Sequence, residues 1–310
     1  MMQHFMQHVA EHGYSYGTIE EFNFRAEIFS QVNQEIESIN MASGKAGKSL
    51  RLAHNHLSTW TYAEKKRMLG FIDVGTAMNG EYHVPSNETI ADSVNWVTAG
   101  AVTAVKDQGQ CGSCWSFSTT GTVEGSYQIN GNPLTAFSEE ELVQCDKFTN
   151  HGCKGGSMAL AFRWLEKHTL NTEANYPYTS GQGVRGECDK SLEMGPVKVT
   201  ALTQVPQSSP EGLKDALSKQ PVSVAIEADK VVFQHYKTGV LTGADCGTSL
   251  DHGVLAVGYG TEDGTDYFLV KNSWGATWGD AGYIKLGVEA GAGVCGIQLQ
   301  PVYANAVAAE

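Results

Sequence analysis

Residues 108–117 read QGQCGSCWSF and place Cys111 and Cys114 three positions apart. Such a pair could be a redox couple, half of a zinc site, or two thiols with unrelated roles. A thioredoxin-like couple would follow a strand in a parallel βαβ unit, and a zinc ribbon would need a second closely spaced pair of cysteines. Cys145 and Cys153 are too far apart to supply that second pair. The sequence therefore favours two separate thiols.

The same segment is typical of a helix that begins at Cys114. Backbone N–H groups and the positive end of the helix dipole stabilise a thiolate there. A nucleophilic thiolate also needs a cationic partner, usually a histidine, and a group that orients the histidine. His252 lies in DHGVLAVGYG and Asn272 in VKNSWG, at comparable ends of two neighbouring predicted strands. These contexts predict that Cys114, His252 and Asn272 act together.

Composition excludes several classes of function. The chain has 310 residues, 41% of them hydrophobic, and a formal charge of -13, so it can form one large domain or two. The negative charge argues against nucleic acid as a partner. No apolar run is long enough for a membrane span, and the start, MMQHFMQHVAEHG, lacks the apolar core of a secretory signal. We expect a soluble protein without a metal or cofactor.

The seven cysteines all lie beyond residue 110. An odd number suggests three disulfides and one thiol that is kept free, and hence an oxidising compartment. The alternative is a reduced cytosolic protein with scattered core cysteines.

The character of the chain changes near residues 85–90. Before that point, the stretch 19–41 predicts one amphipathic helix, which the small and flexible residues MASGKAGKS should end. Its apolar face would consist of Phe22, Ile28, Phe29, Val32, Ile36 and Ile39.

The remainder of the chain mixes helices and strands. Residues 114–168 look helical, and Ser138 followed by Glu141 has the spacing of a capping box. The β-branched runs at 221–228, 252–260 and 266–274 predict strands of an antiparallel sheet or barrel.

The motifs QGQCGSCWSFS, GCKGG, LDHGVLAVGYG and VKNSWGATWGDAGYIKL occur in the order found in the papain family of cysteine proteases, which residues 90–310 resemble. The resemblance implies an α+β fold with two lobes, a helical lobe and an antiparallel β-barrel lobe. It also implies roles at the cleft between them. Cys114 would be the nucleophile, His252 its acid–base partner, Asn272 the group that orients the imidazole, and Gln108 an oxyanion donor. Trp274 would shield the bond between Asn272 and His252 from water.

The resemblance further implies the disulfide pairing and the subsites. Gly155 and Gly156 would pair with the substrate backbone. An apolar S2 pocket would favour aliphatic P2 residues over large aromatic ones, and would accept Arg poorly. No occluding loop or added minichain cysteine is found, so we expect an endopeptidase. The pocket walls would be Met158, Ala225 and Leu250, with Gln300 at the base; the bridges would be Cys111–Cys153, Cys145–Cys188 and Cys246–Cys295.

Residues 1–89 resemble the inhibitory propeptide of cathepsin L-like enzymes, which runs through the cleft in the direction opposite to substrate. Its helix motif is matched by Glu21, Arg25, Phe29, Ile36 and Asn40, with Val32 as a departure. In its second motif Asn55 and Leu57 fit, but Ala53 and Thr59 replace a glycine and an aspartate. We expect Gly70 beside Cys114 and Phe71 in the S2 pocket. The alternative is an amphipathic helix that merely packs or dimerises.

Histidines suggest how such a propeptide could respond to acid, because imidazole changes charge between neutral and lysosomal pH. We hypothesise that their protonation loosens the propeptide; protonation of interface carboxylates could do the same. The six concerned are His4, His8, His12, His54, His56 and His83.

These expectations describe a monomeric endopeptidase zymogen, lysosomal or secreted, that acts on proteins and peptides. Its inhibitors would be its own propeptide and cystatin-type proteins. Asn87 begins a glycosylation acceptor, Asn-Glu-Thr, where the propeptide should meet the peptidase domain. The rival interpretation is a disulfide-stapled binding protein on the same fold without enzymatic activity.

Overall fold

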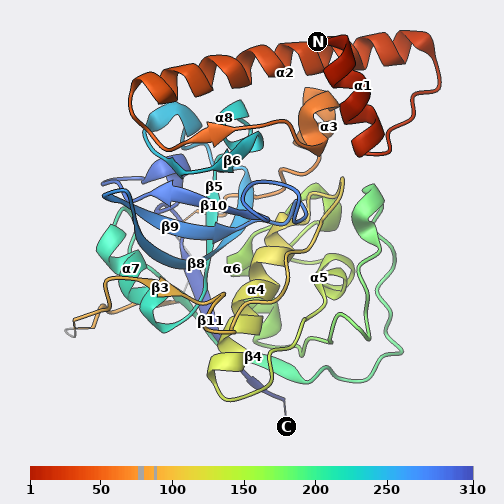
Figure 1. Cartoon of the computed structure of the whole chain (residues 1–310). Coiled ribbons are helices and arrows are strands. Elements are labelled where there is room, and N and C mark those ends of the chain that lie inside the picture. The colour runs from red at the N-terminus through yellow and green to blue at the C-terminus, as the bar shows by residue number, and fades with distance from the viewer. Residues whose placement is uncertain (76–79, 87–88, 310) are drawn as a thin grey trace.

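The computed structural model describes residues 1–75, 80–86 and 89–309, so Asn87 and Glu88 of the glycosylation acceptor lie outside the described residues. Figure 1 shows a helical cap, built from the N-terminal part of the chain, above a helix-rich lobe and a strand-rich lobe. The architecture is the expected α+β combination. Among the described helices, none combines the length and apolar character that crossing a membrane requires.

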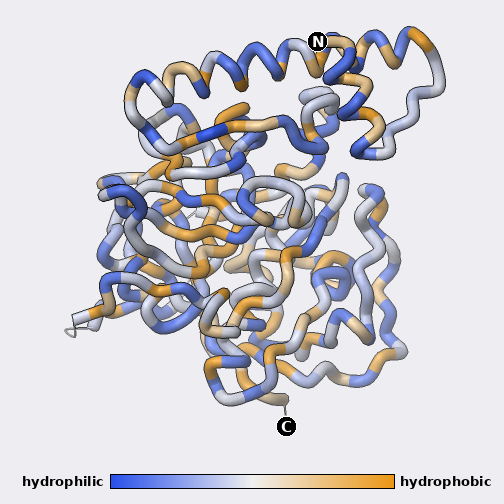
Figure 2. The backbone as a smooth tube through the Cα atoms, viewed as in Figure 1, coloured by the Kyte–Doolittle hydropathy of each residue, from blue (hydrophilic) through white to orange (hydrophobic). Residues whose placement is uncertain are grey.

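The cap is organised around one long helix, α2 (Ile19–Lys45), which Thr18 caps by accepting a hydrogen bond from the backbone N–H of Glu21. Figure 2 shows hydrophilic and hydrophobic residues alternating along α2. Its buried side chains include Phe29, Val32 and Ile36, three of the predicted face. The other elements of the cap are α1 (Met2–Glu11), β1 (Arg51–Leu52), a 3₁₀ helix (His56–Thr59) and α3 (Tyr62–Lys66).

The predicted end of α2 near Met41 is wrong, because the helix continues to Lys45. Ser43 is buried on the helix, and its hydroxyl donates to the carbonyl of Leu50 in the returning chain, at 2.9 Å. That tertiary bond stabilises a turn whose small residues are typical of a loop. Gly47, with a φ of 65°, then reverses the chain.

The helix-rich lobe surrounds α4 (Cys114–Ile129), which is buried along almost its whole length. Ser138 caps α5 (Glu139–Cys145) by accepting from the backbone N–H of Glu141, as the spacing predicts. The carboxylate of Glu141 does not complete a capping box, because it accepts from the backbone N–H of Asn171 instead. The lobe also contains α6 (Met158–Leu165) and 3₁₀ turns at Gly152–Lys154 and Ser180–Gln182.

The strand-rich lobe contains one large sheet with the order β2-β4-β11-β5-β8-β9-β10-β7, and β3 pairs with β8. Its pairings are antiparallel except for β2 with β4 and β7 with β10, which are parallel. The strands are β2 (Glu81–Tyr82), β3 (Val94–Asn95), β4 (Val197–Gln204), β5 (Val222–Ile226), β6 (Tyr236–Thr238), β7 (Val240–Leu241), β8 (His252–Glu262), β9 (Thr265–Lys271), β10 (Tyr283–Gly287) and β11 (Val302–Ala308). The helices are α7 (Pro210–Lys219) and α8 (Val231–Gln234), with 3₁₀ turns at Ala244–Cys246 and Val294–Gly296.

The cap shares its hydrophobic packing with both lobes. One core cluster joins β-lobe residues to cap residues that include Val32, Ile36, Leu57 and Met68. The second cluster fills the helix-rich lobe and includes Phe71. Because burial of apolar surface is the main favourable term in folding, these contacts hold the cap against the rest of the chain.

Backbone pairing adds to this packing. β1 runs antiparallel to β6, and the backbone N–H of Ala53 donates to the carbonyl of His235 at 3.0 Å. Asn55, from the degraded second motif, donates through Nδ2 to the carbonyl of Gln234 at 2.8 Å. The cap is therefore joined to the β lobe by strand pairing as well as by side chains.

A salt bridge joins α2 to α3 near Thr59, the position where the resemblance expects an aspartate. Arg25 of α2 donates two hydrogen bonds to the carboxylate of Glu64 in α3, at 2.6 and 2.8 Å, and one to Glu21 at 2.5 Å. Its guanidinium also donates to the backbone carbonyl of Thr59, at 2.9 Å. Since Thr59 contributes its backbone, the loss of an aspartate side chain there leaves Arg25 with partners.

Candidate active site

Cys114 lies at the first position of α4, at the boundary between the two lobes. Its side chain is fully buried, and its sulfur accepts a hydrogen bond from the backbone N–H of Gly253 in β8, at 3.3 Å. Burial raises the pKa of the thiol to about 11, although backbone amides of Gly253 and Gly70 oppose the rise. With the cap in place, Cys114 is therefore a neutral thiol at physiological pH.

His252 and Asn272 come together because β8 and β9 are neighbours in the sheet. The imidazole Nε2 of His252 donates to Oδ1 of Asn272 at 2.8 Å, since that oxygen can only accept. In the neutral imidazole Nδ1 is then the acceptor, and it has no hydrogen-bond partner within the described part of the chain. Burial lowers the pKa of His252 to about 4, against the opposing effect of Asn272. With the thiol of Cys114 protonated and the imidazole of His252 neutral, both side chains are thus uncharged beneath the cap.

Trp274 covers this hydrogen bond. It is 1% exposed, and its ring centroid lies 4.7 Å from that of His252. Phe233 and Trp278 pack around the indole, with centroids 5.5 and 5.6 Å away. The aromatic cluster therefore lies against the imidazole that forms the Asn272–His252 bond.

Gln108 uses both ends of its amide. Its Nε2 donates to the carbonyl of Met68 in the cap at 2.9 Å and to the carbonyl of Cys111 at 2.8 Å. Its Oε1 accepts from the hydroxyl of Ser273 at 2.8 Å. The amide is therefore locked in one orientation, with a carbonyl of the cap at its donor end.

The chain of the cap passes directly over these residues. The amide of Phe71 donates to the carbonyl of Asp251 at 2.9 Å, and Gly156 and Ile72 form two further backbone bonds with the segment, Gly156 N–H to Gly70 O and Ile72 N–H to Gly156 O, both at 2.8 Å. Phe71 and Gly156 form a parallel bridge. The segment is thus bonded to both lobes.

The expected subsite residues divide into two groups. Met158 and Ala225 belong to the same hydrophobic cluster as Phe71, and Leu250 packs against that cluster. Gln300 is not part of the cluster; its Nε2 donates to the carboxylate of Asp73 in the cap, at 2.5 Å. The structure therefore places the apolar walls around Phe71, while Gln300 contacts Asp73, two positions after Phe71.

The structure contains the three disulfides that the resemblance implied, Cys111–Cys153, Cys145–Cys188 and Cys246–Cys295. Cys114 is a free thiol. The first bridge ties the loop that carries Gln108 to the turn that precedes Gly155 and Gly156. Of the two cysteines in QGQCGSCWSF, Cys111 therefore forms a disulfide and Cys114 is a free thiol.

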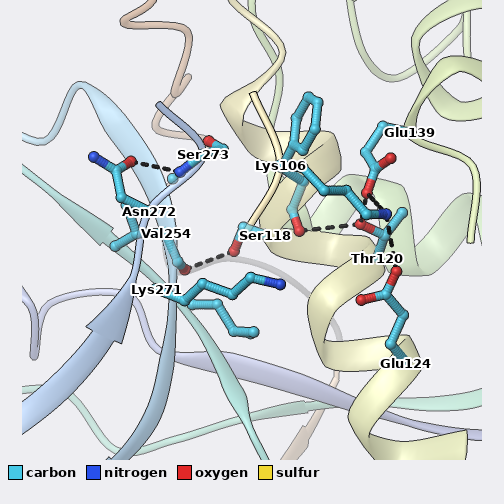
Figure 3. Close-up of a pocket in the computed structure, with 12 residues that line it drawn as sticks. Lys106, Ser118, Thr120, Glu124, Glu139, Val254, Lys271, Asn272 and Ser273 are labelled. Carbon is cyan, nitrogen blue, oxygen red and sulfur yellow. Dashed lines mark hydrogen bonds and ion pairs between the residues drawn. The ribbon is translucent and has the colours of Figure 1, made fainter. Parts of the chain in front are cut away.

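Sequence reasoning missed a buried group of charges behind Asn272 and Ser273. Figure 3 shows Lys106 reaching between Glu124 of α4 and Glu139 of α5, with contacts of 3.0 and 2.6 Å. These residues line a cavity of about 20 Å³, large enough for a single water molecule. No motif marks them, because they are widely separated in the sequence. Ser273 was also missed, although its place beside Asn272 in NSW was a local signal.

No group of three or more His, Cys, Asp or Glu side chains suited to a metal ion is found among the described residues. The geometry instead combines a thiol, an imidazole, an orienting amide and a donor amide.

Comparisons with known proteins agree with this combination. Residues 90–305 match the papain family cysteine protease domain. The chain is 49% identical over 234 residues to Vignain of Ricinus communis, covering 74% of this chain and 64% of that protein. It is 49% identical over 226 residues to the probable cysteine protease RD21B of Arabidopsis thaliana, covering 72% and 48%. The chain thus spans about half to two thirds of the length of these curated relatives.

Solved structures extend the similarity to the cap. The recombinant stem bromelain precursor has a TM-score of 0.87 at 34% identity, and procathepsin L 3 of the Tenebrio molitor larval midgut has 0.85 at 35%. Each comparison covers 98% of both chains. Both of these solved proteins are precursor forms. The chain belongs to the papain family of cysteine proteases.

Proposed function

We propose that this chain is the zymogen of a cysteine endopeptidase, in which residues 1–89 are the inhibitory propeptide and residues 90–310 the peptidase domain. The observation that carries the proposal is the position of residues 68–72. Their backbone meets Gln108, Cys114 and Gly156, the groups that a substrate backbone would meet. The family match that begins at residue 90 supports the same boundary.

Catalysis would start with proton transfer from Cys114 to Nδ1 of His252, the ring nitrogen that Asn272 leaves available. The sulfur bonds to the scissile carbonyl carbon, and the oxyanion accepts from Gln108 Nε2 and the backbone N–H of Cys114. The imidazolium then protonates the leaving amine as the C–N bond breaks. Water adds to the thioester and gives a proton to Nδ1, the carboxylic acid leaves, and the thiol is restored.

The propeptide escapes cleavage because its chain direction in the cleft is opposite to that of a substrate. The family resemblance implies that substrate passes through the cleft in the opposite direction, and the bridge between Phe71 and Gly156 is parallel. The carbonyl that reaches Gln108 is that of Met68, whereas Gly70 is the residue whose amide approaches the Cys114 sulfur. No carbonyl carbon is therefore presented to sulfur and oxyanion donor together.

We propose an apolar preference at P2, because Phe71 shares its cluster with Met158 and Ala225. Leu, Val and Phe would bury apolar surface there, whereas the guanidinium of Arg would lose its hydration without a described partner among the walls. The measurement is a P2 profile with fluorogenic peptides. Peptides with Arg at P2 that are cleaved as fast as those with Leu at P2 would contradict the proposal.

Activation by acid would act through buried and half-buried histidines of the cap. Burial lowers the pKa values of His8, His54 and His56 to about 4, compared with 6.5 for a free imidazole. Below about pH 6.5 the released propeptide therefore binds protons that the closed form excludes, and the closed form loses stability until about pH 4. The other titratable groups that act on these three imidazoles are His4, His12, Glu37 and Asp107. Glu11 faces His12, and Lys65 faces His235 of the β lobe.

Two carboxylates behave differently from these imidazoles. Glu64 lies within the cap, where hydrogen bonds from Arg25 lower its pKa to about 2, so its contribution to the folded cap is lost only between about 4.5 and 2. Burial raises the pKa of Asp251 to about 7, and the hydrogen-bonding and charged groups that act on it belong to the peptidase domain. Neither titration therefore accounts for opening in mild acid.

The remaining expectations follow from this role. We propose protein and peptide substrates, a monomeric enzyme, sensitivity to cystatin-type inhibitors, and a lysosomal or extracellular destination, consistent with the three disulfides.

The experiment that tests the proposal acidifies the purified chain and follows its mass together with cleavage of a fluorogenic Leu-Arg peptide. We expect loss of roughly ninety N-terminal residues and the appearance of activity, both absent from Cys114→Ala. A chain that stays intact and inert in acid, and remains inert after another protease has removed the cap, would instead favour the binding-protein interpretation.

A further inference from the structure

Residues 80–86 of the cap bind the peptidase domain at a different place from the cleft segment, residues 68–72. β2 lies parallel to β4, with Glu81 opposite Thr203 and Tyr82 opposite Gln204, and the amide of His83 donates to the carbonyl of Gln204 at 2.7 Å. β4 pairs with β11 on its other side. β2 therefore covers what would otherwise be an edge of the large sheet.

His83 enters a pocket in the peptidase domain. Its side chain is 1% exposed, whereas its neighbours Tyr82 and Val84 are 60% and 79% exposed. The imidazole Nε2 lies 2.7 Å from Oδ1 of Asp215 in α7, and Nδ1 lies 2.9 Å from the hydroxyl of Tyr303 in β11. One inserted side chain between two exposed ones is typical of recognition by strand addition, in which pockets for alternate residues give specificity.

Ser86 is held by the same carboxylate. Its hydroxyl donates to Oδ2 of Asp215 at 2.6 Å, and its backbone N–H lies 3.2 and 3.1 Å from the two carboxylate oxygens. Asp215 is itself 4% exposed and also pairs with Lys219 at 3.1 Å. A buried carboxylate that gathers an imidazole, a hydroxyl and an amide from one short segment is a built acceptor site.

A cavity lies between the end of the cleft segment and β2. It has a volume of about 330 Å³, and its lining includes Val74 and Gln300 as well as Tyr82 and Gln204. A chain that leaves the S2 region past Gln300 can therefore continue toward the edge of β4.

We infer that the peptidase domain carries a second peptide-binding site, formed by the edge of β4, Asp215 and Tyr303. Its ligand is an extended segment in which an imidazole or ammonium group is followed three positions later by a hydroxyl residue. Residues 81–86 fill it in the zymogen, and segments of protein substrates with this spacing fill it once the propeptide has gone. The inference rests on the proposed boundary between propeptide and peptidase domain.

The test uses the full chain with Cys114→Ala, which cannot process itself, so the result does not depend on peptidase activity. His83→Ala and Ser86→Ala are added to weaken the chain's own segment. A fluorescent peptide of residues 80–86, GEYHVPS, is then titrated and its anisotropy measured. We expect saturable binding, weaker by roughly tenfold or more to the chain that keeps His83 and Ser86, because its tethered segment competes at high effective concentration.

Variants of the acceptor complete the test. Asp215→Asn should weaken peptide binding roughly ten- to a hundredfold, the value of charge-assisted hydrogen bonds, and Tyr303→Phe should weaken it less. Asp266→Asn removes a carboxylate of β9 that pairs with Lys214 of α7 and contacts neither His83 nor Ser86; it is the matched control and should have no effect. Circular dichroism verifies the fold of each variant. No saturable binding, or equal affinity for Asp215→Asn and Asp266→Asn, would overturn the inference.

Discussion

At the scale of single residues, the proposed oxyanion donor Gln108 is held in one orientation by its neighbours. Ser273 and the carbonyl of Cys111 fix its orientation, and the carbonyl of Met68 occupies its donor end. The activated enzyme should therefore lose about 10²- to 10³-fold in kcat on Gln108→Ala, with KM little changed. Steady-state kinetics with the Leu-Arg peptide measure this. A rise in KM alone would mean that Gln108 binds the ground state.

Cys114 provides a second residue-level prediction, which concerns pH. In the intact chain its pKa is raised from 9.0 to about 11, so the thiolate fraction near neutral pH is about a hundredfold below that of an ordinary thiol. Alkylation of Cys114 by iodoacetamide should accordingly be slow and should rise with pH through the alkaline range. After activation, contact with a protonated His252 should make it fast already in mild acid. Mass spectrometry of the alkylated peptide gives both profiles, and identical profiles would contradict the predicted change.

At the scale of elements, the segment over the cleft depends on the absence of a side chain at Gly70. A Cβ there would lie 2.0 Å from the carbonyl oxygen of Gly112, which is backbone and cannot move aside cheaply. Gly70→Ala should therefore lift the segment and give the unprocessed chain measurable activity at neutral pH. Gly44→Ala, in α2 with open space around its Cβ, is the matched control and should stay inactive. Equal inactivity of both variants would contradict the prediction that closure of the site depends on glycine at position 70.

Local signals explain which elements could be predicted. Short motifs and β-branched runs predict the start of α4 at Cys114, the strand that begins at His252 and the strand that ends just before Asn272. The end of α2 could not be predicted, because Ser43 is stabilised by Leu50, a contact made only after the chain returns. Gln300 was expected at the base of an apolar pocket. Its hydrogen bond to Asp73 could not be predicted, because the sequence does not specify the path of the segment that carries Asp73.

At the scale of the whole molecule, the proposed pH response would depend on an interface between the cap and the β lobe. His235 of the β lobe is fully buried against the cap, and burial lowers its pKa well below 6.5; His8, His54 and His56 face it from the other side. Sequence reasoning missed His235, since a lone histidine after α8 acquires this role only through packing. His4, counted among the candidates, is exposed, and His83 belongs to the separate Asp215 site.

Replacing His8, His54 and His56 together by Gln should therefore lower the pH at which the chain activates by roughly one unit. The glutamines remain uncharged, so the proton-linked destabilisation of the closed form is lost. His4→Gln is the matched control and should leave the midpoint in place. The midpoint is read from activity against pH, and an unmoved midpoint in the triple variant would refute the histidine mechanism.

The central claim is that residues 68–72 close a competent site reversibly. Hydrogen–deuterium exchange of the full chain with Cys114→Ala tests it most directly, because this variant cannot cut itself. The amides of Phe71 and Ile72, bonded to Asp251 and Gly156, should be protected at neutral pH and should exchange close to their intrinsic rates at a pH of about 4.5, while α4 and β8 stay protected. Protection of Phe71 and Ile72 that persists in acid, or exchange that spreads through α4 and β8 together with them, would contradict the account.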